Sequence, residues 1–250
     1  MREHRPFYLP GEWAYCIHTM RIQKYFSERK ILSRRETEDF ILKGFVSVNG
    51  VIVKELGTQI DPAKDVVEIV KAARPSLGKK LTIAFHKPRG IVSSKIKTEG
   101  PTVFDLLPQF KYLNTVGRLD KESEGLLLLS NDGTLTAEVT GDGHSTEKEY
   151  EVTVREPLTR GKLRKMEVGI RLSDGMTLPA ETHMQGTHSF RIVLREGRKH
   201  QIRRMCDAMH LTIVKLRRIR IGPVFLKGID SGTFRPLTEK EIAALKQVPK

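Results

Sequence analysis

Cysteine is scarce in this sequence, and that scarcity excludes several kinds of site. The 250 residues include two cysteines, Cys16 and Cys206, which lie far apart in the chain. Such a pair offers neither a disulfide framework nor the ligand spacing of a metal site, and the nearby pair Cys16 and His18 supplies too few ligands for zinc. Cys206 lies on an apolar helical stripe and is expected to be a small buried hydrophobe. We therefore predict that the protein holds no metal.

Long apolar runs are missing as well. No stretch is long enough to span a membrane, and residues 1–19 lack the apolar core of a signal peptide. Prolines, a glycine and a tryptophan in residues 1–19 predict an irregular N-terminal tail. The chain shows no internal repeat, and its 38% of hydrophobic residues can bury a real core. We expect a folded cytoplasmic protein that does not contact membranes.

Positive charge is what the sequence has in excess. Forty-four Lys and Arg stand against thirty Asp and Glu, a surplus of fourteen. Half of this surplus lies between Arg195 and Arg220, where nine cations face two acids, Glu196 and Asp207. Such a concentration favours a polyanionic partner, with nucleic acid as the leading candidate. The alternative, that the charge only keeps the protein soluble, stays open on composition alone.

Residues 20–72 are predicted to form a small module. Ser33-Arg34-Arg35-Glu36 has the form of a capping box that begins a helix, and Gly44 is placed to end it. Two short β-branched runs then flank Asn49-Gly50, a strong local signal for a hairpin. A further strand from Val66 to Val70 would complete the module.

Residues 73–80 combine proline, glycine and cations, and they are predicted to be a linker before a larger domain at 81–246. The alternation of elements in that domain lacks regular strand–helix units, which predicts an α+β fold with a mixed, largely antiparallel sheet. The expected strands are Leu81–Phe85, Leu126–Ser130, Tyr150–Val154, Ser189–Leu194 and Thr212–Ile221. The expected helices are Leu135–Thr140, Arg160–Val168 and Lys199–Met209.

The most distinctive stretch runs from Gly117 to Gly133. A charged loop bounded by glycines precedes a nearly continuous apolar run, short enough for a buried strand. The loop would project Arg118 and Asp120 from the end of a rigid element, where a functional site is well supported. A polar loop with a local Arg–Asp pair explains the same composition, so both interpretations remain at this point.

Three further stretches could serve a nucleic-acid site. Tyr150 lies on an alternating strand, where its ring could stack on a base or simply belong to the core. A helix near residues 199–209 places Ile202 on its apolar stripe and several cations near its start, which favours a partner anion over a merely solvated face. Residues 215–222 alternate cations with apolar side chains, so one face can pack while the other meets phosphates.

Together these stretches resemble the ribosomal RNA pseudouridine synthases typified by RsuA. The resemblance covers nearly the whole chain after Thr19, and residues 20–71 are similar to the RNA-binding module shared with ribosomal small-subunit protein four. The motifs that carry it follow the family's order: Lys87-Pro88-Arg89-Gly90, Gly117-Arg118-Leu119-Asp120, Lys148-Glu149-Tyr150, Gln201-Ile202-Arg203-Arg204-Met205 and Arg218-Ile219-Arg220-Ile221-Gly222.

The resemblance implies a fold, a reaction and roles for individual residues. The fold would be a bent mixed sheet flanked by helices, with RNA in a basic cleft, plus the small N-terminal module. Asp120 matches the family's catalytic aspartate, Tyr150 the aromatic that stacks on the target base, and Arg203 the partner of the aspartate. Arg118 matches the arginine that fills the space of the extruded nucleotide, and Ile202 an aliphatic pocket wall.

The predicted reaction detaches uracil from ribose and rejoins it through C5, so it requires no cofactor. The expected partner is ribosomal RNA, in a structured loop or a pre-ribosomal particle, and we take a monomer as the default. Two rival hypotheses are a non-catalytic ribosome-assembly factor and a glycosidic-bond hydrolase. The predicted RNA contacts are Arg21, Lys24, Arg34, Arg35, Lys87, Arg198, Lys199, Arg204, Lys215 and Arg218.

Overall fold

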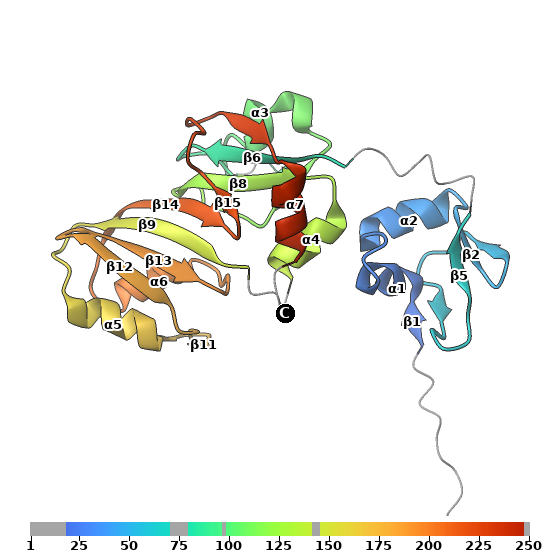
Figure 1. Cartoon of the computed structure of the whole chain (residues 1–250), viewed down its shortest axis with the longest axis horizontal. Coiled ribbons are helices and arrows are strands. Elements are labelled where there is room, and N and C mark those ends of the chain that lie inside the picture. Colours follow the sequence, from blue (N-terminus) through green and yellow to red (C-terminus); the bar gives the residue numbers. More distant parts are fainter. Residues whose placement is uncertain (1–18, 71–79, 97–98, 142–145, 248–250) are drawn as a thin grey trace, which may run out of the picture. The chain divides into compact units, whose positions relative to one another are not determined.

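The computed structural model describes residues 19–70, 80–96, 99–141 and 146–247. The chain divides into two compact units, Met1–Leu77 and Gly78–Lys250, and each is described by itself (Figure 1). The predicted tail with Cys16, and all of the predicted linker except Lys80, lie outside the described residues.

The N-terminal unit packs two short helices against small strands. Its hydrophobic core gathers Ile22 and Phe26 of the first helix, Phe40 and Ile41 of the second, and Val46 of a strand. One sheet has the order β3-β2-β5, and β1 pairs with β4. The elements are β1 (Met20–Arg21), α1 (Ile22–Glu28), α2 (Arg34–Leu42), β2 (Val46–Val48), β3 (Val51–Val53), β4 (Gln59–Ile60) and β5 (Val67–Ile69).

Local sequence signals account for the second helix and the hairpin of this unit. The Ser33 hydroxyl accepts a hydrogen bond from the Glu36 amide, and the Glu36 carboxylate accepts one from the Ser33 amide, so the predicted capping box is confirmed. Asn49 and Gly50 both have positive φ, which is the conformation of the tight turn predicted between β2 and β3.

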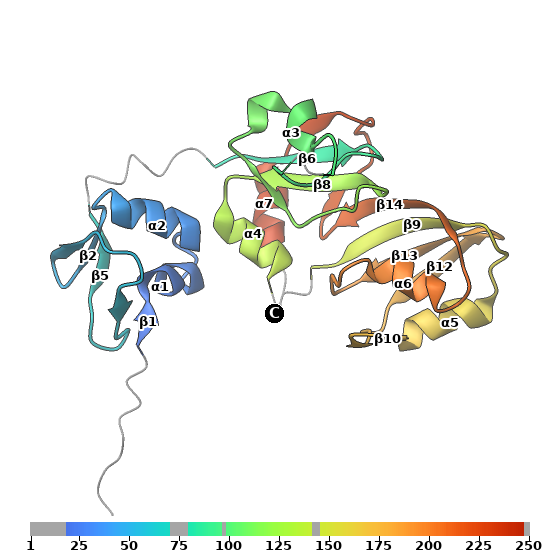
Figure 2. The ribbon, with the colours of Figure 1, turned by 180° about the vertical axis from the view of Figure 1, so that it is seen from behind.

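The C-terminal unit is built on one nine-stranded sheet (Figures 1 and 2). Its strands follow the order β12-β13-β9-β14-β8-β6-β16, while β15 pairs with β14 and β7 pairs with β8. The strands are β6 (Thr82–Lys87), β7 (Asn114–Val116), β8 (Glu124–Ser130), β9 (Lys148–Val154), β12 (Glu181–Gly186), β13 (Ser189–Leu194), β14 (Ile213–Ile221), β15 (Val224–Phe225) and β16 (Phe234–Pro236). Two more strands, β10 (Arg171–Leu172) and β11 (Gly175–Met176), form a separate hairpin.

Helices cover the sheet as predicted for an α+β fold. The helices α5 (Arg160–Val168) and α6 (Gln201–Asp207) share a hydrophobic cluster with β9, β13 and β14. The helices α4 (Gly133–Thr140) and α7 (Glu239–Lys246) pack together beside β8, and α3 (Val103–Leu106) and the 3-10 turn η2 (Pro108–Phe110) lie at its other face. The leucine run of β8 is therefore buried on both sides, since Leu126 and Leu128 belong to one cluster and Leu127 and Leu129 to another. This arrangement confirms the mixed, largely antiparallel sheet.

The two sides of the sheet meet where β8 runs parallel to β14. Arg217 pairs with Glu124 and Arg218 with Gly125 in this register. Gly125 has φ +109°, and a Cβ there would lie 2.3 Å from the Arg218 carbonyl oxygen. Only glycine permits this close approach, and the approach holds the loop before β8 against β14.

The helix predicted at 199–209 is two residues shorter at each end. It begins at Gln201 and ends at Asp207. The later start follows from His200, which takes the left-handed conformation with φ +50°. A residue in that conformation cannot continue a right-handed helix, so Lys199 lies in the preceding turn.

Candidate active site

A cavity of about 600 Å³ lies where the loop before β8 faces α6 across β9 and β14. It collects side chains from three segments that are distant in sequence. Asp120 and Arg118 come from the loop, Tyr150 from β9, and Ile202 and Arg203 from α6. These are the five residues to which the sequence assigned catalytic and pocket roles, and the fold brings all of them to one cavity.

The loop that carries Asp120 is anchored by buried polar groups. The Ser93 hydroxyl donates to the Leu119 carbonyl at 2.8 Å and accepts from the Leu119 amide at 3.2 Å. The Ser123 amide donates to the Asp120 carbonyl at 3.0 Å, which closes a turn before β8 begins. The backbone of Asp120 is therefore held at both sides, and its side chain has a defined direction.

The Asp120 carboxylate lies beside two side chains from the start of α6. Arg203 Nε is 3.6 Å from Asp120 Oδ2, and His200 Nε2 is 3.4 Å from Asp120 Oδ1. A second nitrogen of the Arg203 guanidinium donates to the Ser123 hydroxyl at 3.0 Å, and Ser123 is buried. This bond fixes the guanidinium, so the cation faces the carboxylate in one orientation. A permanently charged, oriented partner favours the ionised form of a carboxylate.

Tyr150 lies between two hydrophobic clusters of the catalytic unit. It packs against the cluster under β9 and against the cluster beside β8, and it lies opposite Arg218 in the β9–β14 register. Its ring is half-buried, so one side contacts the core while the residue still lines the cavity. Ile202 is buried in the adjoining wall, whereas Arg118 is exposed at the cavity.

Comparisons with known proteins show the family of this chain. The family model described as RNA pseudouridylate synthase matches residues 81–208, and the model of the S4 domain matches residues 20–67. The chain belongs to the RNA pseudouridylate synthase family. One relative is the dual-specificity RNA pseudouridine synthase RluF of Escherichia coli K12, which is 38% identical to this chain; the match covers 91% of this chain and 78% of RluF. Another is the ribosomal large subunit pseudouridine synthase B of Bacillus subtilis 168, which is 33% identical; that match covers 90% of this chain and 95% of the relative.

A solved structure shows the same fold. The crystal structure of a pseudouridylate synthase superposes with a TM-score of 0.68 at 30% identity, covering 90% of this chain and 99% of the other. The cavity described above therefore belongs to an RNA pseudouridine synthase, an isomerase of uridine, with an S4 domain before the catalytic domain.

Two of the cations expected to contact RNA are buried inside the synthase, which corrects that expectation. Lys87 is fully buried, and its ammonium donates to the carbonyls of Pro88 and Ile91 at 2.8 and 2.7 Å. Burial lowers the pKa of Lys87 to about 8, although the charge of Asp120 acts in the opposite direction. Because its three donors face main-chain oxygens, Lys87 supports the loop from behind and does not reach a phosphate.

Arg218 is also a structural cation. It is 3% exposed, and its Nε donates to the Leu126 carbonyl at 2.7 Å. One terminal nitrogen donates to the Arg118 carbonyl at 3.3 Å, so Arg218 ties the catalytic loop to β8. A side chain so enclosed cannot act as the surface phosphate contact predicted for it, although it lines the cavity.

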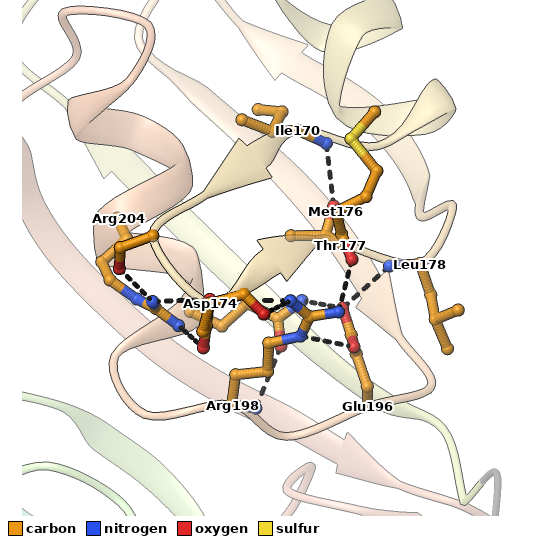
Figure 3. Close-up of polar contacts among 10 residues, drawn as sticks. Ile170, Asp174, Met176, Thr177, Leu178, Glu196, Arg198 and Arg204 are labelled. Atoms are coloured by element: carbon orange, nitrogen blue, oxygen red, sulfur yellow. Dashed lines mark hydrogen bonds and ion pairs between the residues drawn. The ribbon is translucent and has the colours of Figure 1, made fainter. Parts of the chain in front are cut away.

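Arg198 and Arg204 hold the β10–β11 hairpin against the start of α6 (Figure 3). Arg204 makes two hydrogen bonds to the Asp174 carboxylate, at 2.9 and 3.0 Å, and Arg198 donates to the Glu196 carboxylate at 2.9 Å and to the Met176 carbonyl. Their guanidinium groups are thus already bound within the protein. Lys199 is exposed, and Lys215 is half exposed while forming an ion pair with Glu124 at 3.0 Å.

In the N-terminal unit the structure leaves the four predicted RNA contacts, Arg21, Lys24, Arg34 and Arg35, on the surface. Lys24 has an exposed carboxylate partner, Glu28, at 3.6 Å. All four are therefore accessible to an RNA backbone.

The sequence did not single out three residues that matter at the cavity. His200 contacts Asp120, Ser123 orients Arg203, and Lys148 lines the cavity beside Tyr150. Lys148 stands in a motif that carried the family resemblance, and Ser123 lies in the distinctive stretch from Gly117 to Gly133, so these places in the sequence were the available signal. His200 could not be recognised, because its approach depends on its left-handed backbone conformation. Within the described ranges no group of three or more His, Cys, Asp or Glu is placed to hold a metal, and no helix has the length and apolar character to cross a bilayer.

Proposed function

We propose that this synthase converts uridine to pseudouridine in ribosomal RNA, with Asp120 as the nucleophilic carboxylate. The observation that carries the proposal is the pairing of Asp120 with the fixed Arg203 guanidinium, at 3.6 Å, in the cavity that Tyr150 lines. Relatives named as ribosomal large subunit and dual-specificity synthases support ribosomal RNA as the substrate class.

The target nucleotide must leave its helix before the cavity can receive it. Extrusion costs a few kcal/mol, which favours loops and weak pairs as targets. The exposed Arg118 can enter the gap that the nucleotide leaves, and Tyr150 can stack on the base in the cavity. These contacts offset part of the extrusion cost, because they replace stacking that the base loses.

The chemistry needs an ionised carboxylate in a site that excludes water. Arg203 places a fixed positive charge 3.6 Å from the Asp120 carboxylate, and the Asp120 side chain is 37% exposed before RNA binds. Bound RNA would cover this exposed part, and the apolar wall at Ile202 would limit hydrolysis of a detached base. The carboxylate can then attack C1′ or remove a proton from C2′, and the same Asp120–Arg203 pair serves either route.

We further propose that the N-terminal S4 domain contributes RNA affinity through Arg21, Lys24, Arg34 and Arg35, and that the protein acts as a cytoplasmic monomer. Light scattering of the RNA-bound protein measures this state directly, and a mass of two chains in the active complex would contradict it.

The substitution Asp120→Asn tests the catalytic assignment. It keeps the side-chain size but removes the charge, so we expect intact RNA binding and a loss of activity of about 10⁴-fold or more. Activity is measured as tritium release from ribosomal RNA labelled at C5 of uridine, because the C5 proton leaves when C5 joins the ribose.

The matched control is Asp207→Asn, which removes an exposed acid from the last residue of α6 and does not touch the cavity. Normal tritium release by Asp120→Asn would remove Asp120 from its role. Absence of tritium release from the wild-type protein would favour a pure assembly factor, and appearance of free uracil would favour a hydrolase.

A further inference from the structure

Three cations at the cavity have no carboxylate partner among the described residues. They are Lys148, Arg218 and Arg118. The other basic side chains of the wall are engaged, since Arg195 pairs with Glu147, Arg198 with Glu196, and Arg203 with Asp120. The cavity therefore holds positive charge that no carboxylate among the described residues compensates, and Lys148 has no role in the chemistry proposed for Asp120 and Arg203.

Lys148 lies on the same face of β9 as Tyr150, two residues along the strand. Its neighbours across the sheet are Leu194 on β13 and Ile221 on β14, and both also line the cavity. The ammonium donates to the Thr146 carbonyl at 3.0 Å, which uses one of its three N–H groups. A positive charge with spare donors thus lies in an apolar wall next to the ring of Tyr150.

Arg218 adds a second donor to the same wall. It lies opposite Tyr150 on β14, and two of its nitrogens bind the Leu126 and Arg118 carbonyls. Its remaining terminal nitrogen is buried and has no hydrogen-bond partner among the described residues. Leaving a charged donor unsatisfied inside a protein costs more than about 1–3 kcal/mol, so the uncompensated charge of Arg218 beside the cavity favours an anionic partner that arrives with the substrate.

The reaction supplies such a partner. When the bond between N1 and C1′ breaks, the electron pair stays on the base. Asp120 then either bonds to C1′ or takes the proton from C2′, in which case the C2′–H electrons form a C1′–C2′ double bond. The detached uracil then carries a negative charge spread over N1, O2 and O4. The charge disappears when C5 bonds to C1′, the C5 proton leaves and N1 takes up a proton. Asp120 is by then bonded to C1′ or holds the C2′ proton, so it supplies no positive charge to the base.

We propose that Lys148, supported by Arg218, stabilises the negative charge of the uracil base while it is detached from the ribose. This inference rests on the proposed function. A phosphate is the other anion that could meet these cations, but Leu194 and Ile221 flank Lys148 with apolar surface that suits a flat base better than a hydrated phosphodiester. Preorganised donors aimed at charge that develops during a reaction typically contribute about 100-fold or more to its rate.

The protonation of Lys148 gives this role a pH dependence. Burial, reinforced by the nearby Arg218 charge, lowers the pKa of Lys148 to about 8. The charged groups around it are Asp120 and Arg118 on the loop, Arg218 on β14, Arg195 and Glu196 after β13, and His200 and Arg203 at α6. Because the ammonium is the active form, the rate is full below this pKa and falls as the pH rises through it.

Lys148→Met and Lys148→Arg test the inference on the full-length protein with ribosomal RNA labelled at C5 of uridine. For Lys148→Met we expect single-turnover tritium release about 100-fold slower, with an RNA dissociation constant unchanged within about threefold. Lys148→Arg keeps the charge at any accessible pH, so we expect it to retain more activity than Lys148→Met and to lose the alkaline decline near pH 8. Lys227→Met, which removes an exposed cation away from the cavity, should match the wild type.

Three outcomes would overturn the inference. They are a Lys148→Met rate within threefold of the wild type, a rate loss explained entirely by weaker RNA binding, and an alkaline decline that persists unchanged in an active Lys148→Arg. Thermal unfolding of each variant separates these effects from misfolding. If Lys148→Arg is inactive, the replacement test is whether added alkylamines restore tritium release to Lys148→Ala. Failure to restore it would count against the inference. Asp120→Asn, assayed on the same RNA, distinguishes the two proposals. If Asp120→Asn is inactive while Lys148→Met has normal activity, the role of Lys148 is wrong and the role of Asp120 stands.

Discussion

The cations of the N-terminal unit and those between Arg195 and Arg220 looked alike in the sequence but are used differently in the structure. Arg21, Arg34 and Arg35 are exposed, and no ion pair involves them among the residues that the structure describes. In the C-terminal stretch most arginines are bound to carboxylates or to main-chain carbonyls of the same unit. Local charge density therefore overstates how many of these cations are available to RNA.

The difference arises from strand pairing. The β9–β14 register places Arg217 opposite Glu151 and Arg220 opposite Glu149, so the basic strand lies beside an acidic one. Arg217 forms an ion pair with Glu151, and Arg220 Nε lies 2.9 Å from Glu149. Cross-strand pairs of opposite charge stabilise a sheet. Here these pairs engage arginines that, from the sequence alone, looked available to bind RNA.

Removing one cation of this ladder should have the largest effect on stability. Arg220 is 16% exposed and Glu149 14%, so Arg220→Met would leave carboxylates without their partner in a largely enclosed place. We expect a loss of about 3 kcal/mol in the free energy of unfolding, measured with urea. Arg195→Met is the control, because that arginine is 54% exposed and its pairs should contribute less than about 1 kcal/mol. Equal stability of the two variants would contradict the contrast drawn here.

Substitutions of the exposed cations in the N-terminal unit should instead weaken RNA binding and leave the stability of the fold unchanged. Replacing Arg21, Lys24, Arg34 and Arg35 together by Gln should weaken binding of ribosomal RNA roughly tenfold and flatten its dependence on salt. The affinity is measured by titration at several salt concentrations. Lys43→Gln is the control, since that exposed cation of the same unit is already paired with Asp39 at 2.7 Å. An unchanged salt slope in the fourfold variant would mean that these exposed cations do not meet phosphates.

A smaller effect is expected from the ion pair at the other edge of the catalytic sheet. Hydrogen bonds from Arg235 lower the pKa of Glu241 to about 2, from 4.5. A carboxyl group whose pKa is lowered by folding stabilises the folded state at any pH above its pKa in the unfolded chain, about 4.5. This contribution is lost as the pH falls from about 4.5 towards 2. Because Arg235 is 36% exposed, screening limits the contribution to about 1 kcal/mol or less. Acid unfolding of Arg235→Met should start from a lower stability and show a shallower decline over that pH range than the wild type, and parallel curves would argue against the pair.

Local patterns predicted the elements that depend on neighbouring residues. The capping box at Ser33, the turn at Asn49-Gly50 and the buried leucine strand each rest on interactions within a few residues. The convergence of Asp120, Tyr150 and Arg203 followed from the family resemblance, because no local pattern relates segments so far apart. The described structure brings them to one cavity, while their catalytic roles await the tests above.

What the sequence could not show depends on long-range pairing and burial. Lys87 and Arg218 looked like surface cations in basic motifs, yet Lys87 is 0% exposed and Arg218 3%. Their positions follow from which strands lie beside them, and strand order cannot be deduced from charge alternation alone. The same reason hid the role of Ser123, whose partner Arg203 is eighty residues away in the chain.

The bare backbone at Gly125 has a consequence for any attempt to redesign this enzyme. Even a methyl group there would collide with the neighbouring strand and wedge the two halves of the sheet apart. Asp120 lies on the β8 side of that junction and Tyr150 on the β14 side, so the distance between them depends on the absence of a side chain at Gly125. Libraries that aim at new substrates should therefore keep glycine at this position.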